Sequence, residues 1–197
     1  VVRRHAPHSK IIAVIKANAY GHGLLQVANT LVQADAYAVA RLEEALVLRA
    51  NAITKPILVL GGFFSAEALP LLAEHNLRTT LHTWDQLALL EQAKLPAPIK
   101  IWLKLDTGMN RLGVRAQDLP AFIERLSHCR SVVQPFHLMT HFGQSDEQEN
   151  QATQQQIEAF NLLTAHLPGE RAMANSAGIL AWPGSRSDWI RPGIMLY

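Results

Sequence analysis

The strongest constraint on the fold is a regular alternation of short apolar segments with amphipathic ones along the whole chain. The apolar segments predict strands at residues 10–17, 36–41, 56–61, 78–83, 99–107, 134–142, 171–177 and 188–197. Apolar residues at helical spacing predict helices at 23–33, 42–50, 65–75, 84–93, 116–128, 149–166 and 178–182. Strands separated by such helices form parallel βαβ units. Eight units in succession predict an α/β fold, a TIM-type (β/α)8 barrel, and a doubly wound open sheet is the alternative.

The length and composition indicate one ordinary globular domain. A chain of 197 residues can bury one substantial core, and no linker or repeat divides it, so the expected barrel domain covers 1–197. The chain starts on Val1 and stops inside the apolar run "GIMLY". We therefore expect a domain shortened at both ends.

The net charge and the cysteine content limit which partners and which cellular compartment the chain can have. A net charge of +2 is too small to indicate a nucleic-acid partner. The single cysteine, Cys129, excludes an internal disulfide and fits a reducing compartment. No apolar run reaches the roughly 18 residues of a membrane span, and there is no signal peptide. We expect a cytoplasmic protein without a membrane partner.

Polar residues at the strand ends predict a shared pocket, because active sites of such barrels gather at the carboxyl ends of the strands. These ends carry Lys16, Arg41, Leu60 with Gly61, His82, Lys104 with Asp106, His141, Asn175 with Ser176, and Arg191. Alternation within 99–107 places Lys104 and Asp106 inward with Trp102, and it places the aliphatic residues under the helices. His137, Met139 and His141 share a face in the same way.

Two stretches carry specific chemistry. In "VIKANAYGHG", Lys16 closes a buried strand. It either extends its amine to solvent or is a desolvated amine suited to a Schiff base with a carbonyl cofactor. In "RPGI", Arg191 could donate to a ring nitrogen or an oxyanion, and free amides at 193–194 could bind an anion such as phosphate.

Other motif interpretations are weak. Asp-Thr-Gly in "LDTGM" occurs once in a helix-rich chain, whereas an aspartic protease needs two carboxylates face to face in an all-β fold. "GHGLLQ" lacks the third glycine of a dinucleotide fingerprint. His137 and His141 would lie more than about 10 Å apart on a strand, too far to share one metal ion.

Five motifs together resemble one family. "VIKANAYGHG", "KLDTGMNRLGV", "THF", "NSAG" and "RPGIMLY" are similar, in order and over nearly the whole chain, to motifs of the bacterial alanine racemases. Those enzymes are isomerases of fold-type III that use pyridoxal 5'-phosphate (PLP). The resemblance implies a cytoplasmic homodimer that interconverts L-alanine and D-alanine, either to supply peptidoglycan or to degrade D-alanine.

The resemblance also implies roles for individual residues. Lys16 would carry PLP as a Schiff base and act as one of two catalytic bases, with Arg111 and His141 completing the catalytic set. Arg111, with Met109 beside it, would hold the substrate carboxylate, and Lys104 matches a lysine that is often carbamylated. Arg191 would bind the pyridine nitrogen and thereby suppress transamination, because an arginine rarely gives up its proton. The implied cofactor-binding residues are Lys16, Tyr20, Leu60, Asn175, Ser176, Arg191, Gly193 and Ile194.

One part of the family pattern is not in this sequence. The second base is a tyrosine of a C-terminal β domain that reaches across the dimer interface, so the isolated chain is expected to bind PLP poorly and to racemise alanine very slowly. Three alternatives stay open at this point. They are a single-domain PLP-binding homeostasis protein, another amino-acid racemase of the same fold, and a degenerate barrel that serves as a scaffold.

Overall fold

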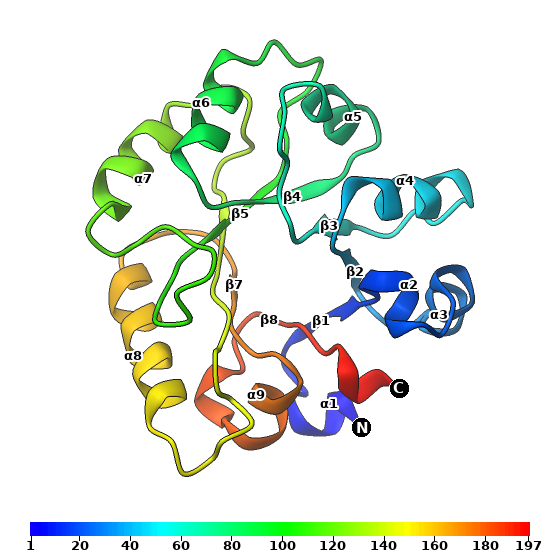
Figure 1. The fold of residues 1–197 in the computed structure, drawn as a ribbon, viewed down its shortest axis with the longest axis vertical. Helices are drawn as coiled ribbons and strands as arrows, with labels where there is room; N and C mark the ends of the chain where they lie inside the picture. The colour runs from blue at the N-terminus through cyan, green and yellow to red at the C-terminus, as the bar shows by residue number, and fades with distance from the viewer.

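A closed barrel of eight parallel strands forms the centre of the molecule, and the helices surround it (Figure 1). The computed structural model describes all residues from 1 to 197. The strands follow one another in sequence order, and β1 pairs with β8 to close the barrel. The predicted (β/α)8 barrel is therefore confirmed, and the open sheet is excluded. The strands are β1 Lys10–Val14, β2 Ala36–Val39, β3 Ile57–Val59, β4 Arg78–Leu81, β5 Ile101–Lys104, β6 His137–Met139, β7 Arg171–Ala172 and β8 Trp189–Ile190.

Every predicted helix is present, although several begin or end at other residues than expected. The α-helices are α1 Val2–His5, α2 Lys16–Tyr20, α3 Leu24–Thr30, α4 Leu42–Ala50, α5 Ala68–Glu74, α6 Trp84–Gln92, α7 Leu119–Ser127, α8 Ala152–Thr164 and α9 Ser176–Ala181. Two 3-10 turns, η1 Pro183–Ser185 and η2 Ile194–Leu196, follow α9 and β8. None of these helices combines the length and the apolar character that a membrane crossing requires.

The strands are shorter than the sequence predicted. The predicted strand 188–197 ends at Ile190, because Pro192 has no amide proton to donate and the chain then enters η2. The predicted strand 10–17 ends at Val14, so Lys16 follows the strand and opens a turn.

Alternating side chains divide the core into two clusters. Ile12 and Val14 of β1 point into the barrel, whereas Ile11, Ala13 and Ile15 pack outside it under the helices. The inner cluster consists of Ile12, Val14, Ala36, Ala38, Leu58, Trp102, Met139, Ala172 and Trp189. The same alternation holds in β5, where Trp102 is inside and Leu103 outside, as predicted.

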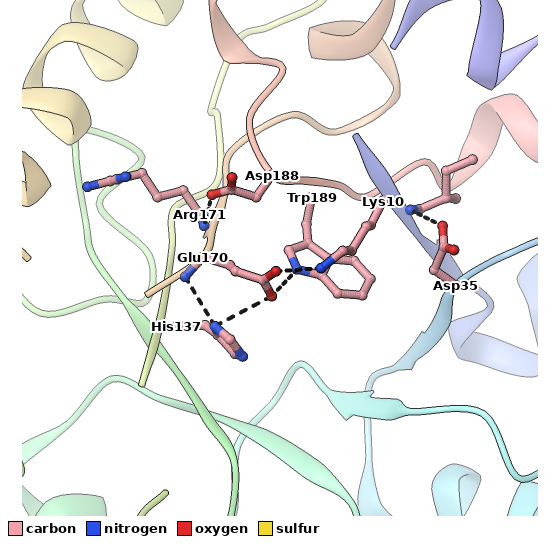
Figure 2. A network of polar contacts seen from close by, with 8 residues as sticks. Lys10, Asp35, His137, Glu170, Arg171, Asp188 and Trp189 are labelled. Carbon is pink, nitrogen blue, oxygen red and sulfur yellow. Dashed lines mark hydrogen bonds and ion pairs between the residues drawn. The ribbon is translucent and has the colours of Figure 1, made fainter. Parts of the chain in front are cut away.

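A polar network around Glu170 and Trp189 lies at the amino-terminal end of the barrel (Figure 2). The Glu170 carboxylate accepts hydrogen bonds from Lys10 Nζ and from Trp189 Nε1, the latter at 2.7 Å. The Trp102 ring lies 4.7 Å from the His137 ring and meets the Trp189 ring edge-on at 6.2 Å, measured between centroids. Trp102 and Trp189 thereby fill the interior of the barrel toward its amino-terminal end.

Candidate active site

A cavity of about 580 Å³ opens at the carboxyl-terminal end of the barrel, above the inner cluster. Every residue to which the family resemblance assigned a role, except Met109, lines it, together with residues that the sequence did not single out. The lining consists of Val14, Lys16, Tyr20, Ala40, Leu60, Gly61, Lys104, Arg111, Leu112, Met139, His141, Ser145, Asp146, Asn175, Ser176, Ala177, Arg191, Gly193 and Ile194. The strand ends therefore converge on one pocket.

Four residues lie elsewhere than expected. Met109 packs beside Gly143, and Arg41 is exposed at the start of α4. Asp106 does not line the cavity, because its Oδ1 accepts hydrogen bonds from the backbone amides of Gly108 (3.1 Å) and Asn110 (3.0 Å) and so organises the loop. His82 lines a different cavity.

Lys16 opens a left-handed turn. Ala17, Asn18, Ala19 and Tyr20 each have φ of 53°, which is rare for residues with a Cβ. A left-handed helical conformation costs roughly 1–2 kcal/mol per residue. Four such residues in a row therefore need support from the surrounding structure.

Distant side chains supply this support. The Glu44 carboxylate accepts from the Ala17 amide at 2.6 Å, and it also accepts from the amides of Ala40 and Arg41 at 2.8 and 3.1 Å. Asn18 Oδ1 accepts from the Leu24 amide at 2.9 Å. The turn thereby carries the chain from Lys16 to Tyr20, and both side chains reach the cavity.

Tyr20, Gly193 and Ser176 meet at one side of the cavity. A Cβ on Gly193 would lie 2.4 Å from Tyr20 Oη, so only glycine leaves the hydroxyl in place. Ser176 Oγ accepts from the amides of Gly193 (3.0 Å) and Met195 (3.3 Å). The expectation of a free Gly193 amide is therefore wrong, because the serine hydroxyl already binds it.

Arg191 is held rigidly at the base of the cavity. It is 3% exposed, and its Nη1 donates to the Ala172 carbonyl at 2.7 Å. Nη2 donates to the carbonyls of Thr140 and of Met173 and lies 3.5 Å from His141 Nδ1. Burial lowers the pKa of Arg191 to about 10, so the guanidinium keeps its charge at neutral pH.

The other titratable groups respond to burial and to the neighbouring cations. Burial, followed by the charges of Arg191 and Lys104, lowers the pKa of His141 to about 3, so its imidazole is neutral. Burial and the nearby arginines lower the pKa of Lys104 to about 8. Burial raises the pKa of Tyr20, which therefore presents a neutral hydroxyl.

The charge balance of the lining favours an anionic ligand. Two lysines and two arginines face a single acid, Asp146. The volume suits a small organic molecule. No group of three or more His, Cys, Asp or Glu side chains is placed to hold a metal ion.

The loop residues of the lining were missed for a simple reason. Leu112, Ser145 and Asp146 follow the strand ends by several residues, in segments without a strand or helix pattern, whereas Ala177 lies in the first turn of α9 beside Ser176. Ser145 Oγ donates to Asn175 Oδ1 at 2.9 Å, a contact that no sequence spacing signals.

Comparisons with known proteins agree with one another. The family model described as "Alanine racemase, N-terminal domain" matches residues 1–197. The chain is 69% identical over 197 residues to an alanine racemase of Aeromonas hydrophila, and 54% identical over 196 residues to a biosynthetic alanine racemase of Salmonella typhimurium. In each case all of this chain is covered, but only 55% of the relative. The chain thus spans about half the length of these relatives.

Solved structures give the same result. The biosynthetic alanine racemase of Pseudomonas aeruginosa superposes with a TM-score of 0.94 at 40% identity, covering 100% of this chain and 55% of that one. The alanine racemase of E. faecalis superposes with a TM-score of 0.90 at 29% identity, covering 100% and 56%. From its sequence and its fold, this chain belongs to the alanine racemase family, and it matches that family's N-terminal domain throughout.

Proposed function

We propose that this chain is the PLP-binding barrel of a cytoplasmic, homodimeric enzyme that interconverts L-alanine and D-alanine. The observation that carries the proposal is the position of Lys16, an amine held by a strained turn at the wall of a cationic cavity. Because the chain spans about half of its relatives, we propose that residues 1–197 form one domain of a longer protein. A C-terminal β domain would supply the second base, a tyrosine.

The residues present fit PLP. The neutral hydroxyls of Tyr20 and Ser176 and the amide of Ile194 would bind its phosphate, near Gly193, where the absence of a Cβ leaves room. Leu60 and Asn175 would complete the binding surface. When bound, PLP supplies an electron sink for negative charge at the substrate Cα.

Lys16 would hold the cofactor and exchange a proton with one face of Cα at its Nζ. Arg111, which is exposed at the mouth of the cavity without a carboxylate partner, would bind the substrate carboxylate. We propose that Met109 acts only through the loop that carries this arginine, since it does not line the cavity.

Arg191 and His141 would set the electronics of the pocket. The guanidinium is fixed by three backbone carbonyls and keeps its proton, so a ring nitrogen beside it would stay unprotonated. With the ring nitrogen unprotonated, negative charge would stay closer to the substrate Cα. Return of a proton to Cα would then be favoured over transamination. His141 lies against Arg191, and its Nδ1 can accept a hydrogen bond from the guanidinium. Because its imidazole is neutral, it adds no charge to the site.

Lys104 is suited to carbamylation. Burial lowers its pKa to about 8, so part of the population is a neutral amine at neutral pH. Attack of this amine on CO2 forms an N–C bond and releases a proton. The resulting negative charge would pair with Arg111, which has no ion-pair partner in the chain.

Proton exchange tests the proposal. The full-length protein with PLP is incubated with L-alanine in D2O, and deuterium at Cα and the D-alanine fraction are followed by NMR and chiral chromatography. We expect both to appear together and to vanish in Lys16→Arg. A protein that binds PLP but exchanges no Cα proton would be a carrier, and the proposal would fail.

A further inference from the structure

A buried glutamine of α8 joins the two loops that carry Arg111 and His141. Gln156 is 3% exposed, and both polar atoms of its side chain have partners. Its Nε2 donates to the His141 carbonyl at 3.1 Å and to Thr107 Oγ1 at 3.3 Å, and its Oε1 accepts from the Gly143 amide at 3.0 Å. This one side chain thus ties the loop that follows β5 to the loop that follows β6.

Backbone groups fix the orientation of the Gln156 amide. The Gly143 amide can only donate and the His141 carbonyl can only accept, so a reversed side-chain amide would lose both bonds. The neighbouring hydroxyls continue the same direction. Thr140 Oγ1 donates to a backbone carbonyl at the end of β5 at 3.0 Å, so in its 2.7 Å contact with Thr107 Oγ1 it is the acceptor. Every donated proton has one acceptor, and the contacts form one connected network.

The loop that carries Arg111 is supported from outside by this network. No helix or strand lies between Lys104 and Leu119, and Gly108, Asn110 and Gly113 have φ of 135°, 57° and 149°. Arg111 itself is exposed and takes part in none of the ion pairs of the chain. The position of its guanidinium therefore depends on where the backbone of the loop is held.

The loop also packs directly against the residues of the network. A Cβ on Gly108 would lie 3.4 Å from Gln156 Cγ, and one on Gly143 would lie 3.7 Å from Met109 Cγ. Met109 thus lies against the residue whose amide Gln156 binds, two positions before Arg111. These contacts give Met109 a route to the site although it does not line the cavity.

The end of β6 is in turn attached to the base of the cavity. Arg191 Nη2 donates to the Thr140 carbonyl and lies 3.5 Å from His141 Nδ1. Through Gln156, the loop of Arg111 is therefore attached to the same strand end that holds Arg191. The two arginines on the cavity wall are in this way kept in a fixed relation by a residue that lies outside the cavity.

We propose that Gln156 is a positioning residue that holds the loop of Arg111 against the end of β6, and so sets the affinity of the cavity for a carboxylate. This inference rests on the proposed function, in which Arg111 binds the carboxylate of alanine. Without the Gln156 bonds, the loop would keep its internal bonds to Asp106 but lose its attachment to the strand end. Arg111 would then spend less time where it can form two parallel bonds to a carboxylate.

Binding of propanoate, which is alanine without its amino group, to the full-length protein with PLP tests the inference. Gln156→Met keeps the length of the side chain and removes its three hydrogen bonds, and Gln155→Met, at the neighbouring exposed residue, is the matched control. In an NMR titration, the Kd for propanoate should rise roughly tenfold in Gln156→Met and stay unchanged in Gln155→Met. The KM for L-alanine should rise with it, whereas kcat and the Kd for PLP should change little.

Amide hydrogen exchange reports the contact itself. With 15N-labelled glycine, the resonance of Gly143 is identified by its loss in Gly143→Ala, and its exchange should become about tenfold faster in Gln156→Met. Thr107→Val removes only the bond between Gln156 and the Arg111 loop, together with the bond to Thr140. It should weaken propanoate binding without speeding exchange at Gly143, and it should add little to Gln156→Met, because the two variants remove the same bond.

Equal affinity for propanoate in Gln156→Met and Gln155→Met would overturn the inference, and so would unchanged exchange at Gly143. If Gln156→Met does not fold, Thr107→Val decides, since wild-type affinity for propanoate in that variant would also overturn it. None of these binding and exchange readouts depends on turnover. Failure of the racemase proposal would be seen separately, as absence of Cα exchange in the wild type.

Discussion

Adding a single methyl group at Gly193 should weaken PLP binding. The Cβ of Gly193→Ala would lie 2.4 Å from Tyr20 Oη, whereas carbon–oxygen contacts need more than 3 Å. The hydroxyl would have to move by about 1 Å, since optimal contacts lie near 3.5–4.0 Å. The position from which Tyr20 reaches a phosphate would then be lost.

The size of the effect follows from the bond that is lost. A hydrogen bond from a neutral hydroxyl to a charged phosphate contributes about 1.5–3 kcal/mol. Since about 1.4 kcal/mol corresponds to a tenfold change in affinity, the Kd for PLP should rise roughly 10- to 100-fold. Gly184→Ala is the matched control, because the nearest atom to its Cβ is Ile157 Cγ2 at 4.0 Å.

A double-mutant cycle shows whether the loss runs through the hydroxyl. PLP is titrated into the full-length apoprotein and followed by absorbance for the wild type, Gly193→Ala, Tyr20→Phe and the double variant. Tyr20→Phe should weaken PLP to a similar extent, and Gly193→Ala should then add little, because the atom it collides with is gone. Additive effects, or equal affinity in Gly193→Ala and Gly184→Ala, would refute the reasoning.

Three further predictions follow from other parts of the structure. Glu44→Ala removes the acceptor of three backbone amides and should cost about 2 kcal/mol in urea unfolding and lower PLP occupancy, whereas exposed Glu43→Ala should change neither. Arg191→Glu should raise the ratio of transamination to racemisation, measured as pyruvate formed per turnover, and an unchanged ratio would contradict the role given to this arginine. Glu170→Gln should lower the free energy of unfolding by about 1 kcal/mol at pH 7. The loss is small because the Glu170 carboxylate is partly exposed to solvent. Burial alone would raise the pKa of Glu170, but the bonds from Lys10 and Trp189 lower it overall, so its contribution is present above the unfolded pKa and is lost as the pH falls through the folded pKa. The difference between Glu170→Gln and wild type should therefore shrink as the pH falls below the unfolded glutamate pKa of about 4.3 and vanish only below the lower folded pKa, and a difference independent of pH would speak against the network.

Much of the barrel could be predicted from the sequence, because its signals are local. In β1, alternate residues pack inside and outside the barrel, and the order of strands and helices is sufficient to indicate parallel βαβ units. The site followed from the same pattern, since the strand ends of a closed parallel barrel must converge. Lys16, His141 and Arg191 were placed in one pocket by this argument, and the structure brings them there.

Features that depend on distant contacts could not be predicted. Of Ala-Asn-Ala-Tyr only Asn18 favours a left-handed conformation, and the turn is held by Glu44 from another helix. The use of the Gly193 amide by Ser176 likewise joins residues from different loops. His82 was expected in the cavity with the other strand ends, but it lines a different cavity, and Gly62 lets the neighbouring loop approach its ring.

The central claim is that Lys16 is the lysine that carries PLP. The most direct test is borohydride reduction of the full-length protein with PLP, followed by trypsin digestion and mass spectrometry. Attachment blocks cleavage at Lys16, so the account predicts the added mass on a single peptide from Ile11 to Arg41. Label on Lys104 or on another lysine, or no label in a protein that racemises alanine, would contradict it.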